Sequence, residues 1–111
     1  MNKRFVTLRD MHDEGGHRSL AASLAQDGTL TITGQDLGDG VEQFFGPGNR
    51  EYEWVWTIRA QHVPQLAAAL GAGDDLLAAL AARFSDDRAA ELQPFLDEQA
   101  IPYDYWSRIG D

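Results

Sequence analysis

The sequence contains no cysteine, little basic charge and no long apolar run, and each absence excludes a class of function. Without cysteine, the 111-residue chain has no disulfides, no thiolate metal ligands and no thiol nucleophile. No apolar run approaches the ~20 residues that a membrane-spanning helix requires. The N-terminal residues MNKRFVTLRD also lack the continuous apolar segment of a signal peptide. We therefore expect a cytoplasmic protein.

Acidic residues outnumber basic residues by two to one. The 18 acidic and 9 basic residues give a net charge of −9. Because nonspecific binding to nucleic acid or to an anionic membrane requires a basic surface, we expect neither partner. Nine acidic but only three basic residues lie between Asp74 and Asp111. This acidic C-terminal third is interpreted either as a solvated surface that keeps the protein soluble or as a contact surface for a basic protein.

Alternating hydrophobic residues predict the strands of a single domain that spans residues 1–111. Hydrophobic residues make up 43% of the chain, which is ordinary for a folded domain. Residues 5–10 alternate and predict a first strand. Two further alternating runs flank Asp27-Gly28, which is the strongest short-range signal for a β-hairpin. The aromatic and β-branched stretch REYEWVWTIR, residues 50–59, predicts a fourth strand.

Glycine-rich segments interrupt these runs, and we expect them to be irregular. Met11–His17 is interpreted as a loop, and the stretch from about Gly34 to Asn49 as a long irregular connection. The glycines of the second stretch, from about Gly34 to Asn49, precede no Lys-Ser/Thr pair and no expected helix. They therefore predict neither a phosphate-binding loop nor a dinucleotide fingerprint. We expect these glycines to serve turns that need a positive φ.

After Arg59 the hydrophobic period changes from two to about 3.6, which predicts three helices. Gly71 is expected to end the first, Asp74 or Asp75 to cap the second, and Pro94 to kink the third or to make it start near Gln93. Their apolar stripes comprise Val63, Leu66, Ala67 and Leu70, then Leu76, Leu77, Leu80 and Phe84, then Leu92, Phe95 and Leu96. Residues 101–110 predict a weak fifth strand or an extended tail. The fold class is therefore α+β, with an antiparallel sheet of four to five strands, an N-terminal meander, and three C-terminal helices on one face.

The fourth strand places an aromatic stripe on one sheet face. Tyr52, Trp54, Trp56 and Ile58 occupy alternate positions, and we expect them to form the core under the helices. Alternatively, part of this stripe lines a pocket together with the Phe44–Asn49 loop. The residues of that pocket are then Phe44, Phe45, Arg50, Tyr52, Trp54 and Trp56. Adjacent Phe44 and Phe45 also indicate that one of the two is exposed.

The polar residues predict no enzyme. Asp10, His12, Asp13, Glu14 and His17 offer metal-binding atoms, but a spacing of five residues between the histidines in a Gly-rich loop matches no established ligand pattern. We expect a solvated loop there, with no metal and no cofactor. His62 is interpreted as part of a helix start. No serine lies in a G-x-S-x-G motif.

Much of the chain resembles a group of small, uncharacterised bacterial proteins of about this length. The resemblance is carried by REYEWVWTIRAQHVPQLAAALG, DDLLAALAARF and FLDEQAIPYDYWSRIGD. It implies no activity, cofactor or catalytic residue. In size and acidity alone, the chain also resembles the immunity proteins that neutralise bacterial toxins.

These observations favour a non-enzymatic binding protein of the cytoplasm. The first hypothesis is an immunity-type protein whose acidic residues meet a basic protein partner, through Asp74, Asp75, Asp86, Asp87, Asp97 and Glu98. The alternative is a small-molecule or peptide binder with its pocket near Trp54, Trp56 and the Phe44–Asn49 loop. A homodimer through a sheet edge, or through Tyr103, Tyr105 and Trp106, is compatible with either hypothesis.

Overall fold

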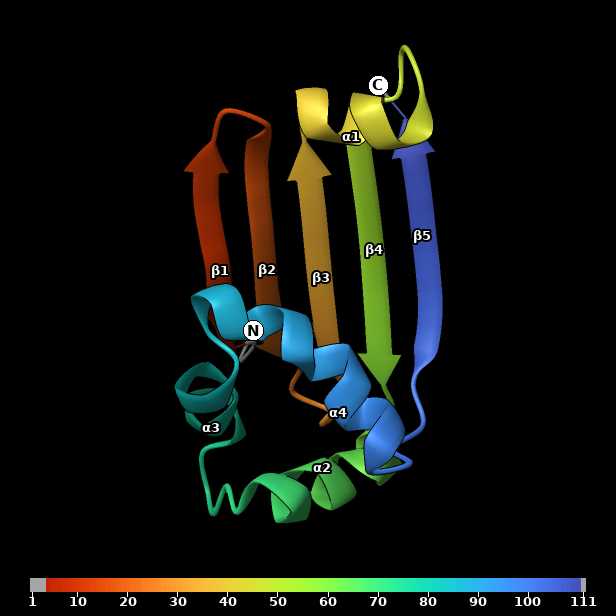
Figure 1. The fold of residues 1–111 in the computed structure, drawn as a ribbon. Helices are drawn as coiled ribbons and strands as arrows, with labels where there is room; N and C mark the ends of the chain where they lie inside the picture. Colours follow the sequence, from red (N-terminus) through yellow and green to blue (C-terminus); the bar gives the residue numbers. More distant parts are fainter. Residues whose placement is uncertain (1–3, 111) are drawn as a thin grey trace.

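The protein has an α+β fold built on a five-stranded antiparallel sheet, as the sequence predicts (Figure 1). The computed structural model describes residues 4–110. Each strand pairs with its neighbour along the chain, in the order β1-β2-β3-β4-β5. The strands are β1 (Arg4–Asp13), β2 (Gly16–Leu24), β3 (Leu30–Leu37), β4 (Glu51–Ile58) and β5 (Asp104–Gly110). The fifth strand is thus paired with β4 and is not a free tail.

The helices that follow β4 lie over one end of one sheet face, the lower end as drawn in Figure 1. We call the face that carries them the front face and the opposite one the back face. The helical segments are α1 (Asp39–Phe45), η1 (Ala60–His62), α2 (Val63–Leu70), α3 (Leu76–Arg83), η2 (Asp86–Glu91) and α4 (Leu92–Glu98). Gly71 ends α2 in the left-handed conformation, with φ 63°, and Asp75 caps α3 by accepting from the N–H of Ala78. Both predicted helix boundaries are confirmed.

The core lies between the lower end of the sheet and these helices. Ile32 and Ile58 from the sheet and Leu80 from α3 are fully buried, and Trp54 and Trp56 are buried beside them. The aromatic stripe of β4 therefore belongs largely to the core, as expected. Within residues 4–110, no helix has the length and apolar character needed to cross a membrane.

The prediction of a loop over Met11–His17 is wrong. Strand β1 continues to Asp13 and β2 begins at Gly16, so only Glu14 and Gly15 form the turn. Gly16 has φ 132°, and a Cβ there would lie 1.7 Å from the backbone oxygen of Leu37. The glycines thus serve one tight turn packed against a neighbouring strand, which local composition does not distinguish from a longer loop.

The expected irregular connection from Gly34 to Asn49 is also partly wrong. Strand β3 continues to Leu37, and the helix α1 opens directly after Gly38, whose φ of 109° ends the strand. Asp39 and Glu42 lie in the first helical turn, where acidic side chains interact favourably with the helix dipole. A seven-residue helix carries too little periodicity to predict from the sequence.

Candidate functional site

The helices leave the upper half of the front face open. Two adjoining hollows lie there and share Tyr52. The upper hollow has a volume of about 280 Å³ and lies beside α1, where it is lined by residues that include Arg18, Asp36, Val41, Phe44, Phe45 and Tyr52. The lower hollow has a volume of about 250 Å³ and reaches the helix edge, where it is lined by residues that include Arg9, Tyr52, Trp54, Trp56, Gln93 and Tyr105. We call the two hollows together the cleft.

A β-bulge brings one arginine into this cleft. The pairing of β1 with β2 shifts between Thr7 and Arg9, so that Val6 faces Ala22 and Arg9 faces Leu20. Both Val6 and Arg9 therefore lie on the front face, although strict alternation would separate them. The bulge explains why the sequence did not identify Arg9 as a candidate site residue.

Four polar atoms at the cleft are buried without a hydrogen-bond partner among residues 4–110. They are Arg9 Nε, Asp36 Oδ1, Trp54 Nε1 and Trp56 Nε1. A buried polar group left unpaired costs about 1–3 kcal/mol, so such groups are rare in folded proteins. All four belong to residues that line one of the two hollows.

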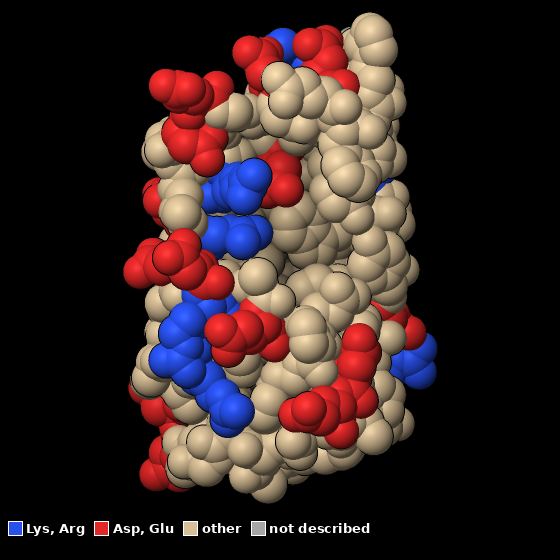
Figure 2. Space-filling model, in the orientation of Figure 1, with Lys and Arg blue, Asp and Glu red and all other residues tan. Residues whose placement is uncertain are grey.

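Arg9 and Arg18 supply positive charge to the cleft. Neither forms an ion pair with another described residue, whereas Arg4, Arg50, Arg59 and Arg108 all do. Figure 2 shows basic side chains beside an acidic one where the surface is hollowed. Burial raises the pKa of the Asp36 carboxyl above its ordinary value, while the charges of Arg9 and Arg18 oppose that rise. The cleft thus combines two cations with a carboxyl group that is held less acidic than usual.

Aromatic rings form one wall of the cleft. Phe45 from α1 lies with its ring centroid 5.3 Å from that of Tyr52, which in turn lies 5.1 Å from the ring of Trp54. The Tyr52 and Tyr105 hydroxyl oxygens are 2.8 Å apart. This hydrogen bond, reinforced by burial, raises the pKa of Tyr52 to about 12, so the Tyr52 hydroxyl stays neutral at physiological pH.

Glycine allows the indole of Trp54 to lie across β3. Gly34 pairs with Trp54 across the sheet, and a Cβ on Gly34 would lie 2.1 Å from two ring carbons of this indole. A side chain at residue 34 would therefore displace the ring from the cleft wall. Gly34 is a site-forming residue whose role the sequence alone did not reveal.

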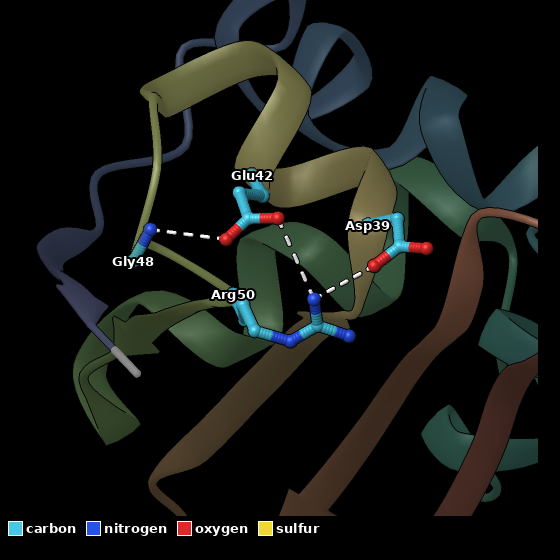
Figure 3. A network of polar contacts seen from close by, with 4 residues as sticks. All are labelled: Asp39, Glu42, Gly48 and Arg50. Carbon is cyan, nitrogen blue, oxygen red and sulfur yellow. Dashed lines mark hydrogen bonds and ion pairs between the residues drawn. The ribbon is translucent and has the colours of Figure 1, made fainter.

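Ion pairs hold α1 at the top of the cleft (Figure 3). Arg50 places Nη1 2.7 Å from Asp39 Oδ1 and 3.5 Å from Glu42 Oε1, and Glu42 Oε2 accepts from the N–H of Gly48 at 3.0 Å. The N–H of Gly40 donates to the backbone oxygen of Gly15, which joins α1 to the β1–β2 turn. Arg50 therefore anchors the segment that carries Phe44 and Phe45.

The predicted pocket residues are largely brought together. Phe44, Phe45 and Tyr52 line the upper hollow, and Tyr52, Trp54 and Trp56 line the lower one, whereas Arg50 lines neither. Phe44 is 83% exposed and Phe45 is half-buried, which confirms that one of the adjacent phenylalanines is exposed. The lining residues that the sequence missed include Arg9, Arg18, Asp36, Val41, Gln93 and Tyr105.

The six predicted acidic contact residues are all exposed, on or between the helices. Asp75 also pairs with Arg4 at 3.1 Å, and Asp97 accepts from the hydroxyl of Tyr103 at 2.8 Å. In the view of Figure 2 the acidic side chains lie in separate groups with other residues, some of them basic, between them. They do not form one continuous acidic surface in this view.

The two histidines of the first hairpin are brought close together. Their rings stack at 4.0 Å with an interplanar angle of 3°, and His17 Nε2 lies 2.6 Å from Asp10 Oδ1. The neighbouring Asp13 accepts from the N–H of Gly15 within the turn. His62 lies in η1, at the start of α2, as expected.

Comparison with family models, with curated proteins and with solved structures returned no match. The resemblances to small bacterial proteins and to immunity proteins therefore stay predictions. Functional inference depends on the geometry of the cleft.

Proposed function

We propose that this protein binds a small aromatic acid in the cleft on its front face. The single observation that carries the proposal is that the residues with four unpaired buried polar atoms line two adjoining hollows. Binding sites for small molecules are concave and mostly apolar, with a few directed polar groups, and this cleft has that composition. The proposal develops the pocket hypothesis drawn from the sequence.

The donors of the cleft favour an anionic group. Arg9 Nε and the indole N–H groups of Trp54 and Trp56 are three buried donors without an acceptor among the described residues. A carboxylate has lone pairs for several such donors, and charge-assisted hydrogen bonds are about twice as strong as neutral ones. Arg18 adds a second positive charge at the upper hollow. Asp36 would accept from a hydroxyl or amino group on the same ligand.

The aromatic wall favours a ring on the ligand. Phe45, Tyr52 and Trp54 present neighbouring rings along the cleft, and aromatic pairs contribute about 0.5–1.5 kcal/mol beyond simple burial. Volumes of about 280 and 250 Å³ suit one small molecule. A hydroxyphenyl or indolyl carboxylate combines these features.

Calorimetric titration with matched pairs of compounds tests the proposal. Each acid, such as 4-hydroxyphenylacetate or indole-3-acetate, is compared with its neutral amide. We expect saturable binding of an acid and at least about tenfold weaker binding of its amide, because a charged hydrogen bond contributes about 1.5–3 kcal/mol.

Two arginine variants make this test specific to the cleft. Arg18→Gln is expected to weaken acid binding about tenfold, since it removes one of the two cleft cations. Arg59→Gln is the matched control, because Arg59 pairs with Asp104 at the end of β4 away from α1 and lines neither hollow of the cleft. Equal binding of acids and amides, or equal losses in the two variants, would contradict the proposal.

The acidic-surface hypothesis stays a separate prediction. Asp74, Asp87 and Glu98 are exposed and form no ion pair with another described residue, so their charges are free to meet a basic protein. Affinity capture from a lysate of the native host, at low and at high salt, tests it. A basic protein retained only at low salt, and released by charge reversal at these residues, is the expected result.

A further inference from the structure

A second candidate site lies at the tip of the first hairpin, next to the upper hollow of the cleft, which His17 also lines. We propose that Asp10, His12 and His17 bind one divalent first-row transition metal ion, with Zn²⁺ as the probe. Each of the three residues offers one ligand atom, and these atoms all lie within 4.8 Å of one another. The sequence had predicted a solvated loop without a metal here.

The hairpin register creates this cluster. His12 and His17 face each other across the β1–β2 pair, and Asp10 lies two residues before His12 on the same face of the strand. The nearly parallel imidazole rings direct both Nε2 atoms toward one carboxylate oxygen, with His17 at 2.6 Å and His12 at 3.6 Å from Asp10 Oδ1. Strand alternation places these side chains on the back face, opposite Arg9 and Arg18.

The donor set and its spacing suit a transition metal. Two imidazole nitrogens and one carboxylate oxygen are typical ligands of Zn²⁺, with bonds of about 2.0–2.2 Å, which place tetrahedral ligand atoms about 3.3 Å apart. Asp10 would move slightly away from His17 and toward His12, and the ion would replace their hydrogen bond. Because Asp10 is 61% and His12 75% exposed, this adjustment is sterically free and leaves a coordination position open to water.

The backbone that carries the ligands is tied down at its turn. The N–H of Gly15 donates to Asp13 Oδ1 at 2.8 Å, and the backbone oxygen of Gly15 accepts from the N–H of Gly40 in α1 at 2.8 Å. The two strands thus fix the ligand positions before an ion arrives. A preformed arrangement reduces the conformational entropy lost on binding.

Titration of the untagged protein with ZnCl₂, followed by calorimetry, tests the proposal. We expect one ion per chain, and at least about tenfold weaker binding for His12→Asn and for His17→Asn. Binding should also weaken as the pH is lowered, because protons compete with the metal for the imidazole nitrogens. Far-UV circular dichroism establishes that each variant is folded.

His62→Asn is the matched control, because it removes a histidine that lies outside the hairpin, in η1. It should bind Zn²⁺ as the unsubstituted protein does. No saturable binding, one ion per two chains, or equal losses in the His17→Asn and His62→Asn variants would overturn the proposal. Because His12 lines neither hollow of the cleft, the His12→Asn variant separates the loss of Zn²⁺ binding from any change in acid binding.

Discussion

The upper and lower halves of the front face are built from the same strands but have different surroundings. In the lower half, the side chains of β3 and β4 lie under helices, and Ile32 and Ile58 are fully buried. In the upper half, the same strands present Asp36 and Tyr52 to open hollows. The difference follows from the chain length after β4, because three short helices cover only part of the sheet. The front face of this sheet therefore carries both a stable core and an open polar surface.

The largest expected effect concerns the covered half. Leu80→Ala removes a fully buried side chain of α3 and should lower the free energy of unfolding by about 3 kcal/mol, since both burial and packing are lost. Urea denaturation followed by circular dichroism measures this. Phe44→Ala, at the exposed end of the cleft, should change the free energy of unfolding by less than about 0.5 kcal/mol. Similar losses in the two variants would contradict the division of the face into two halves.

The next effect concerns the boundary between the halves. Gly34→Ala places a Cβ inside the indole of Trp54, so the ring must move, and we expect a loss of about 2 kcal/mol in unfolding free energy. The tryptophan fluorescence spectrum should change as well. Thr33→Ala, the adjacent residue on the back face, is the control and should cost less than about 0.5 kcal/mol. A Gly34→Ala protein as stable as this control would show that the ring does not lie across β3.

The sequence predicts those features of the two halves that arise from neighbouring residues, and it misses those that depend on residues far apart in the chain. The alternation of Trp54 and Trp56 and the helical stripes predicted the covered half, because hydrophobic periodicity is local in the sequence. Arg9 and Asp36 were missed because their place in the cleft depends on a β-bulge and on pairing between distant strands. The turn at Gly16 and the helix α1 were missed because each depends on contacts with another segment.

A smaller effect concerns the change of stability with pH, which we expect to have opposite signs at the carboxyl groups of Asp36 and Asp27. Burial raises the pKa of Asp36 in the folded state, so its favourable contribution exists below its unfolded pKa and is lost as pH rises through the folded pKa. Asp36→Asn should therefore stabilise the protein at pH 7, and this gain should disappear near pH 3. Denaturation curves at several pH values measure it.

Asp27 provides the matched comparison. The N–H of Thr29 donates to its carboxylate and lowers the pKa, so its contribution exists above the unfolded pKa and is lost as pH falls through the folded pKa. Asp27→Asn should accordingly destabilise the protein at pH 7. The same sign of change in both variants would contradict the burial of Asp36 in the cleft.

The smallest expected effect on stability concerns the tyrosine pair. Tyr105→Phe removes the hydrogen bond that contributes most to the raised pKa of Tyr52, so that pKa should fall from about 12 toward 10. Spectrophotometric titration of the phenolate measures it. Because the raised pKa favours the neutral hydroxyl, the contribution of Tyr52 is present below about pH 10 and lost as pH rises through 12. An unchanged titration would show that the two hydroxyls are not paired.

The most direct test of the central claim uses the indole N–H signals of the three tryptophans in a ¹H–¹⁵N correlation spectrum. Trp54 and Trp56 line the cleft, whereas Trp106 lies on the back face, pairs with Val55 across the sheet, and is 50% exposed, so it serves as an internal reference. Titration with an aromatic acid such as indole-3-acetate should shift the Trp54 and Trp56 signals, in a saturable manner, and leave that of Trp106 unchanged. Unchanged signals from Trp54 and Trp56, or equal shifts of all three, would contradict a ligand-binding cleft on the open half of the sheet.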